Sequence, residues 1–462
     1  MTARLILLAL LASCGHDVAL GGPNTLVRVD PEPEGVHCED GGVAIQTGLD
    51  LDGDTYLDDE EIVTTQYVCN GVSPVACAGG VVVEGTVVIA DASELSQLAG
   101  VNCVDGDVLI AGVDASELPL DSLEIVTGDL VVAGNPQLAT LAGRASMRHV
   151  GRRVLIQGNP ALGDLGSLGK LERAFSLTVI GNDGLTDLRG LEGFIDTRIN
   201  INITNNGELT SLSGFESLRS TTELLVIKTN RKLTDTTALG GLRSVNLLEV
   251  SGNVALQELR LPALEKVDVR LIIDNNTALT TLDAPALATV GDFLSLNGNA
   301  NLTSFALPDL LTINSLLIRN STSLQTISLP NLSFITSHLE LASTPALASI
   351  DFGSLLSLGG NLLVRQSGLR NFTGFPLLSS IGGDLSVLQT TALASFAGLG
   401  ALERVSGSFV ITGNNALASF AGLGAFAEVG GDLTITSNSS LPNSAAQAFA
   451  TSITVRGDTT IQ

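Results

Sequence analysis

Apolar residues return along most of this chain at a nearly constant interval. From Leu95 onward a Leu recurs every 20 to 24 residues, and a second apolar residue follows three positions after most of them. Ahead of each Leu lies a short strand-like run, such as Leu130-Val131-Val132 or Phe409-Val410-Ile411. A fixed period in the twenties is the signature of a solenoid, in which each repeat forms one coil that stacks on the last.

The repeat is clearest near the end of the chain. The ten residues ALASFAGLGA occupy 392–401 and recur unchanged at 416–425, 24 positions later. Extended backward, the pattern predicts about sixteen coils of 22–24 residues. The predicted fold is an all-β, right-handed, single-stranded β-helix-like solenoid over residues 77–453, with 454–462 as a C-terminal end. An Ala-rich run at 445–450 predicts a short helix near this end.

A polar residue follows each strand by three positions. Backbone groups that leave a sheet at a corner need hydrogen-bond partners, and a stacked side-chain amide can supply them. We therefore predict a structural ladder rather than a ligand site, with Asn able to adopt the left-handed conformation of a corner. Its members are Asn135, Asn159, Asn182, Asn206, Asn230, Asn253, Asn276, Asn299, Asn414 and Asn438, with Ser321, Thr344, Ser367 and Thr390 between.

The coils are of two kinds. Those at about 127–220 and 369–429 carry Gly after the second apolar position, as in FAGLGAL. Those at about 256–335 carry Pro instead, at Pro262, Pro285, Pro308 and Pro330. Because Pro donates no backbone hydrogen bond, we expect this position at a turn or coil edge. The two kinds indicate fused blocks of duplication, forming either one rod or several abutting domains.

The N-terminus predicts export. Arg4 precedes a short apolar run that ends in Leu11-Ala12-Ser13-Cys14, which resembles the lipobox of bacterial lipoproteins. The resemblance implies that residues 1–13 are a cleaved lipoprotein signal peptide and that acylated Cys14 anchors the chain in a membrane, with an ordinary cleaved signal as the alternative. We expect residues 14–35, rich in Gly and Pro, to be a tether. The expected location is the cell envelope, at the outer membrane or cell surface.

Residues 36–72 form a small acidic module. Its centre, DLDGDTYLDDEE, resembles the calcium loop of EF-hands. That resemblance implies calcium as a cofactor, although Thr55 replaces the Gly usual at the sixth position. The alternative is a solvated acidic turn between two strands. The implied ligands are Asp50, Asp52, Asp54, the carbonyl of Tyr56, Asp58 and Glu61.

Four further cysteines precede most of the repeats. Cys38, Cys69, Cys77 and Cys103 permit three pairings. We favour Cys38–Cys69 and Cys77–Cys103, because each pair then brackets its own module; free buried thiols are the alternative. The pattern from Cys77 through Asn102-Cys103 to Ile110 resembles the first coil of receptor L-domains, which are ligand-binding solenoids of the leucine-rich-repeat class. The resemblance implies that Cys77 and Cys103 cap the first coil.

Charge separates some functions from others. The formal net charge is −25, and no Lys or Arg lies between Arg28 and Arg144. Such a surface repels nucleic-acid phosphates, so we expect no nucleic-acid partner; the acidity also serves solubility. The four His are scattered and no catalytic motif is present. We therefore expect no catalysis.

The sequence predicts a lipid-anchored surface protein for binding or adhesion. Its expected partners are the membrane, through the lipid, and an unidentified extracellular protein or glycan. Two other classes stay open: a β-helix enzyme acting on extracellular polysaccharide, and a passive envelope spacer. A clustered, non-repeating polar patch would favour binding, whereas a uniform face would favour the spacer.

Overall fold

The computed structural model describes residues 25–32, 42–49, 57–58, 61–69, 77, 79–141 and 146–462. The chain divides into two compact units, Met1–Ala76 and Cys77–Gln462.

The first unit contains a three-stranded antiparallel sheet. Its order is β1 (Thr25–Glu32), β2 (Gly42–Leu49), β3 (Ile62–Cys69). Arg28 on β1 donates from Nε to Gln46 Oε1 (2.7 Å) and from Nη1 to the carbonyl of Leu57 (2.6 Å). The tether predicted over 14–35 is wrong for residues 25–32. Residues 25–32 pair along their whole length with β2. This third strand stabilises the sheet, because a sheet of two strands alone is only marginally stable.

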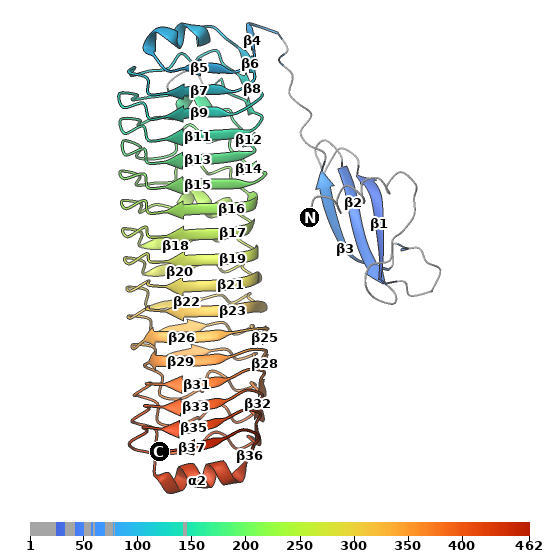
Figure 1. The fold of residues 1–462 in the computed structure, drawn as a ribbon, viewed down its shortest axis with the longest axis vertical. Helices are drawn as coiled ribbons and strands as arrows, with labels where there is room; N and C mark the ends of the chain where they lie inside the picture. Colours follow the sequence, from blue (N-terminus) through green and yellow to red (C-terminus); the bar gives the residue numbers. More distant parts are fainter. Residues whose placement is uncertain are drawn as a thin grey trace. The chain divides into compact units, whose positions relative to one another are not determined.

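The second unit is a solenoid of parallel strands (Figure 1). Sixteen parallel pairings join seventeen strands along its main face. The ladder is open, because β5 and β37 lie at opposite ends of the stack (Figure 1). The strands are β5 (Val87–Ile89), β7 (Val108–Ala111), β9 (Leu130–Ala133), β11 (Arg153–Gln157), β13 (Ser176–Ile180), β15 (Asn200–Thr204), β16 (Ser220–Lys228), β17 (Ser244–Ser251), β19 (Lys266–Asp274), β21 (Thr289–Asn297), β23 (Thr312–Arg319), β26 (Leu339–Thr344), β29 (Leu362–Ser367), β31 (Leu385–Leu388), β33 (Phe409–Thr412), β35 (Leu433–Thr436) and β37 (Thr459–Ile461).

Shorter strands form a second side of each coil, which we call the side face. In the middle coils they are the first residues of β16, β17, β19, β21 and β23, whose pairing shifts register before the main face begins. Elsewhere they are separate: β4 (Val82–Glu84), β6 (Cys103–Asp105), β8 (Ile125–Val126), β10 (His149–Val150), β12 (Arg173–Ala174), β14 (Asp196–Thr197), β25 (Phe334–Ile335), β28 (Ser357–Leu358), β30 (Ser380–Ile381), β32 (Arg404–Val405), β34 (Glu428–Val429) and β36 (Thr454–Val455).

The Pro-containing coils and the coil that follows them have a third set of paired strands. These are β18 (Glu258–Arg260), β20 (Thr281–Asp283), β22 (Ser304–Ala306), β24 (Thr326–Ser328) and β27 (Ser349–Asp351). Pro262 comes two residues after β18 ends, in the turn that follows. The predicted position of Pro at a turn is thus what the structure shows, since the ring removes no ladder bond there.

The interior is one continuous apolar cluster. Inward Leu, Ile and Val side chains stack coil on coil and are nearly all fully buried. Towards the C-terminus a column of stacked rings joins them: Phe372 lies 5.7 Å from Phe396, which lies 5.9 Å from Phe420. Phe420 stacks in turn on Phe449 at 3.9 Å. The repeated ALASFAGLGA therefore supplies two rungs of this column.

Both ends of the solenoid are capped. At the N-terminal end the 3₁₀ helix η2 (Ala92–Leu98) begins with a capping box between Asp91 and Glu94, and the predicted Cys77–Cys103 disulfide is confirmed. At the C-terminal end α2 (Asn443–Ser452) buries Phe449 against the last coils. Residues 454–462 were expected to lie beyond the array. Instead β36 and β37 pair with β34 and β35, so the stacking continues past 453. Two further short helices lie among the described residues, η3 (Gly166–Leu168) and η4 (Thr237–Gly241).

The Gly-containing coils depend on close approach of the backbone. Gly398 has φ +106°, and a Cβ at that position would overlap the carbonyl of Phe372 in the preceding coil. Gly422 has the same relation to Phe396. Gly400, only two residues away, has open space around its Cα. The first Gly of FAGLGA is thus required by stacking, whereas the second is free.

We predict that Gly398→Ala lowers the free energy of unfolding by about 2 kcal/mol or more, because it adds backbone strain and a clash. Gly400→Ala, the matched control, should change it by less than about 0.5 kcal/mol. Denaturant unfolding of the two variants provides the measurement. Equal effects would show that the coils do not approach as closely as the structure has them.

Candidate binding surface

The predicted polar ladder lies inside the solenoid and bonds one coil to the next. From Asn135 to Asn276, each backbone N–H donates to Oδ1 of the next ladder Asn at 3.0–3.1 Å. Each Nδ2 donates to a strand carbonyl of the preceding coil, as Asn206 does to Val179 at 3.0 Å. The buried amides are Asn135, Asn159, Asn182, Asn206, Asn230, Asn253, Asn276, Asn299, Asn414 and Asn438. Because these groups satisfy one another, none is presented to a ligand.

Hydroxyl groups take over in the middle of the array. Ser321 Oγ donates to the carbonyl of Leu296 at 3.3 Å, and Thr344 Oγ1 to Ser367 Oγ at 3.3 Å. The amide pattern resumes where Thr390 N–H donates to Asn414 Oδ1 at 2.8 Å. A hydroxyl reaches one neighbour where an amide reaches two, so this segment has fewer side-chain bonds between coils.

The left-handed residue of the corner was predicted one position too late. The structure places φ values of 50–74° at the residue before each ladder position, not at the ladder residue. The ladder Asn must point inward and hence keeps an ordinary backbone conformation. These left-handed residues are Gly134, Gly158, Gly181, Asn205, Thr229, Gly252, Asn275, Gly298, Asn320, Ser343, Gln366, Gln389, Gly413 and Ser437.

A second ladder, absent from the sequence interpretation, lies at the corner before the main face. Asp107 Oδ1 accepts from the N–H of Asp129 (2.8 Å), and Asp129 Oδ1 from that of Arg153 (3.0 Å). The same link recurs from Asp384 to Ser408 and from Asp432 to Asp458. The available signal was a Gly-Asp pair directly before the strand. Carboxylates that accept backbone bonds in this way hold coils together instead of forming a reactive cluster.

Most of the predicted N-terminal site lies outside the described residues. This applies to Cys14, Cys38, Asp50, Asp52, Asp54 and Tyr56, and to the side chain of Cys69. Of the remaining two calcium ligands, Asp58 N–H donates to Glu61 Oε2 at 3.2 Å, and Glu61 is buried. In the part of the chain that the structure describes, no three His, Cys, Asp or Glu side chains gather closely enough to hold a metal ion. Nor do these residues include a helix long and apolar enough to cross a membrane.

The two described histidines lie on the surface of coils. His149 is half-buried on β10, and this burial lowers the pKa of its imidazole. His338 is exposed at the corner before the main face, where its Nδ1 accepts a hydrogen bond from the N–H of Asn361 at 3.1 Å. The environment of each imidazole is thus set by its own coils, through partial burial for His149 and a backbone hydrogen bond for His338.

Positive charge is concentrated in one part of the solenoid. Sixteen of the 23 Lys and Arg residues lie between Arg144 and Arg270, along with 14 of the 48 Asp and Glu residues. This stretch therefore carries a slight positive charge in a chain whose net charge is −25. An electrostatic surface that varies along the stack is the opposite of the uniform face expected for a passive spacer.

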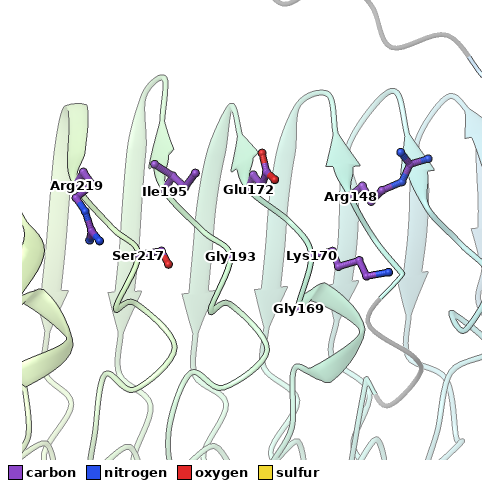
Figure 2. Close-up of a pocket in the computed structure, with 8 residues that line it drawn as sticks. All are labelled: Arg148, Gly169, Lys170, Glu172, Gly193, Ile195, Ser217 and Arg219. Carbon is purple, nitrogen blue, oxygen red and sulfur yellow. The ribbon is translucent and has the colours of Figure 1, made fainter.

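An open groove of about 810 Å³ lies on the side face within this stretch (Figure 2). Each of its walls comes from a different coil, so the sequence separates residues that stacking brings together. The lining residues are Arg148, Gly169, Lys170, Glu172, Gly193, Ile195, Ser217 and Arg219. Figure 2 shows the charged side chains following one another along the stack.

The cations of the groove differ in how they are neutralised. Arg148, at the groove's first coil, pairs with Glu124 at 2.5 Å and stays largely exposed. Arg219 donates from Nη1 to the carbonyls of Glu216 (2.8 Å) and Leu218 (3.1 Å). Among the described residues, neither Lys170 nor Arg219 has a carboxylate within ion-pair distance. The groove therefore retains positive charge that is available to a bound anion.

Comparison with known proteins gives little further identification. Residues 24–69 match a family model described as a domain of unknown function (DUF7151), which covers the three-stranded sheet. No curated protein matches the chain. A solved structure titled "Crystal structure of TLR13-ssRNA13 complex" is 14% identical, with 78% of this chain and 67% of that chain covered and a TM-score of 0.18. At so low a score the likeness says nothing about what this chain binds.

Proposed function

We propose that this chain is a lipid-anchored recognition protein of the cell surface, for which the solenoid provides an extended binding surface. Acylated Cys14 holds it in the outer membrane, and the coils present their outward side chains to an extracellular glycan or protein. The resemblance of the pattern from Cys77 to Ile110 to the first coil of receptor L-domains agrees with this role. No catalysis is part of the proposal.

The observation that carries the proposal is the contrast between inward and outward positions. On the main face, Val154, Leu177 and Ile201 point inward and are fully buried in three successive coils. The outward residues next to them change class, from Leu155 to Thr178 and then Asn202. Stacking fixes only the inward set. Outward variation with a local charged groove is the property that separates a recognition surface from a uniform spacer.

The enzyme alternative requires convergent reactive groups. A β-helix enzyme on polysaccharide would need a base and a stabilising cation held together in a groove. Glu172 and Lys170 are the groove's only such combination besides the arginines, and both side chains are exposed to solvent and not enclosed together in a pocket. Binding is the function better supported by this geometry.

The anchor is tested by Cys14→Ser in the full chain. The wild type should sediment with membranes and be cleaved by protease added to intact cells, because acyl chains supply lasting membrane affinity. Cys14→Ser should appear in the soluble fraction. Membrane retention of the variant would contradict the lipid anchor, and protection of the wild type from added protease would contradict surface display.

Calcium is the proposed ligand of the acidic loop at residues 50–61. Clustered carboxylates repel one another, so a bound hard cation should stabilise the fold around them. With the soluble Cys14→Ser chain, calcium should raise the melting temperature of the first unit and chelator should reverse the shift. Asp52→Asn/Asp54→Asn should abolish the response, whereas the exposed pair Asp114→Asn/Asp121→Asn should keep it. A response shared by both variants, or none in the parent, would rule out this site.

A further inference from the structure

We infer that the groove on the side face binds an acidic polysaccharide in which charged sugars alternate with neutral ones. The inference rests on the proposed recognition function and names the ligand class of one site. It follows from the spacing of the groove's charges, from the composition of its floor and from the hydrogen bonds that its backbone N–H groups already make between coils.

The charges of the groove are separated along the stack. Arg148, Glu172 and Arg219 occupy equivalent positions in the side face, with Ile195 between the last two. Arg148 and Arg219 are three coils apart, or about 14 Å at the usual spacing of strands. Glu172 would repel a chain that carries an anion on every unit. A chain whose anions are separated by neutral units avoids Glu172 and reaches the cations on either side.

The floor of the groove suits a narrow polar chain. Gly169 and Gly193 stack in adjacent coils and leave the floor without side chains, while Ser217 adds a hydroxyl. Sugar hydroxyls can bond with Ser217 and with the carboxylate of Glu172, and sugar carboxylates or sulfates can bond with Lys170 and Arg219. The side chains thus match both kinds of sugar in an alternating polymer.

Other anionic partners fit the groove less well. An extended acidic peptide commonly binds to a free strand edge, but Ile195 N–H already donates to Glu172 O (2.9 Å) and Arg219 N–H to Ile195 O (3.0 Å). Ile195 is the only large apolar side chain lining the groove, which gives little for a membrane to take up. Aromatic anchors typical of protein interfaces are absent from the same lining residues.

The test compares a groove variant with a charge-matched control in the full-length, soluble Cys14→Ser chain. Lys170→Gln/Arg219→Gln removes the two cations that have no paired carboxylate. Arg370→Gln/Arg404→Gln removes two exposed cations from coils outside the groove and gives the same change in net charge. Equal melting temperatures of the two variants check that both are folded.

Binding is measured at low ionic strength to immobilised hyaluronan, κ-carrageenan and neutral dextran, and to poly-L-glutamate and vesicles of anionic phospholipid. Every second sugar carries a carboxylate in hyaluronan and a sulfate in κ-carrageenan. We expect binding to hyaluronan or κ-carrageenan but not to dextran, weakened about tenfold or more by the groove variant and less than twofold by the control. The first two probes distinguish a carboxylate ligand from a sulfate ligand.

Three results would overturn the inference. One is no binding to either acidic polysaccharide, and another is binding that both variants weaken equally. The third is tighter binding to poly-L-glutamate or to vesicles. Polysaccharide binding that is insensitive to the groove variant would reject this site while leaving the recognition function standing, whereas failure of surface display would reject the function and not the groove chemistry.

Discussion

The solenoid depends on the hydrogen bonds of its buried corners. Each coil must turn sharply inside the stack, where its backbone N–H and C=O groups have lost both water and the regular strand pairing. Leaving such groups unsatisfied costs about 1–3 kcal/mol each. A ladder Asn satisfies two of these backbone groups. Its Oδ1 accepts a hydrogen bond from one backbone N–H, and its Nδ2 donates one to a strand carbonyl. Apolar side chains can then stack between corners whose backbone groups are hydrogen-bonded.

Fixed corners determine what the rest of each coil can do. The preceding residue takes the left-handed conformation, the strands pair in register, and the next corner is bonded by Asp107, Asp129 and their equivalents. Where coils lack Pro, Gly190 and Gly398 allow the turns to approach the coil before. The inward positions therefore have little freedom. Outward positions are not restricted in this way, so charged residues can gather over one block of coils without disturbing the stacking.

The sequence predicted those features that repeat with the coil. Period, inward Leu positions, the polar ladder and the turn position of Pro all follow from residue type at a fixed offset. Features set by pairing between segments distant in the sequence were missed. The strand at 25–32 gains its place from pairing with residues 42–49, and the Gly-Asp ladder is visible only when Asp107 is set beside Asp129. The groove could not be predicted from the sequence for the same reason, because only the register of the coils shows that Arg148, Lys170 and Arg219 lie close together.

The dependence on the amide ladder is tested most directly by Asn206→Ala, which leaves the N–H of Asn182 and the carbonyl of Val179 without their side-chain partners. Asn301→Ala, at an exposed position, is the control. The ladder account predicts that denaturant unfolding of Asn206→Ala shows a loss of about 2–5 kcal/mol relative to that control. A loss no greater than that of Asn301→Ala would contradict it and would show that apolar stacking alone holds the coils together.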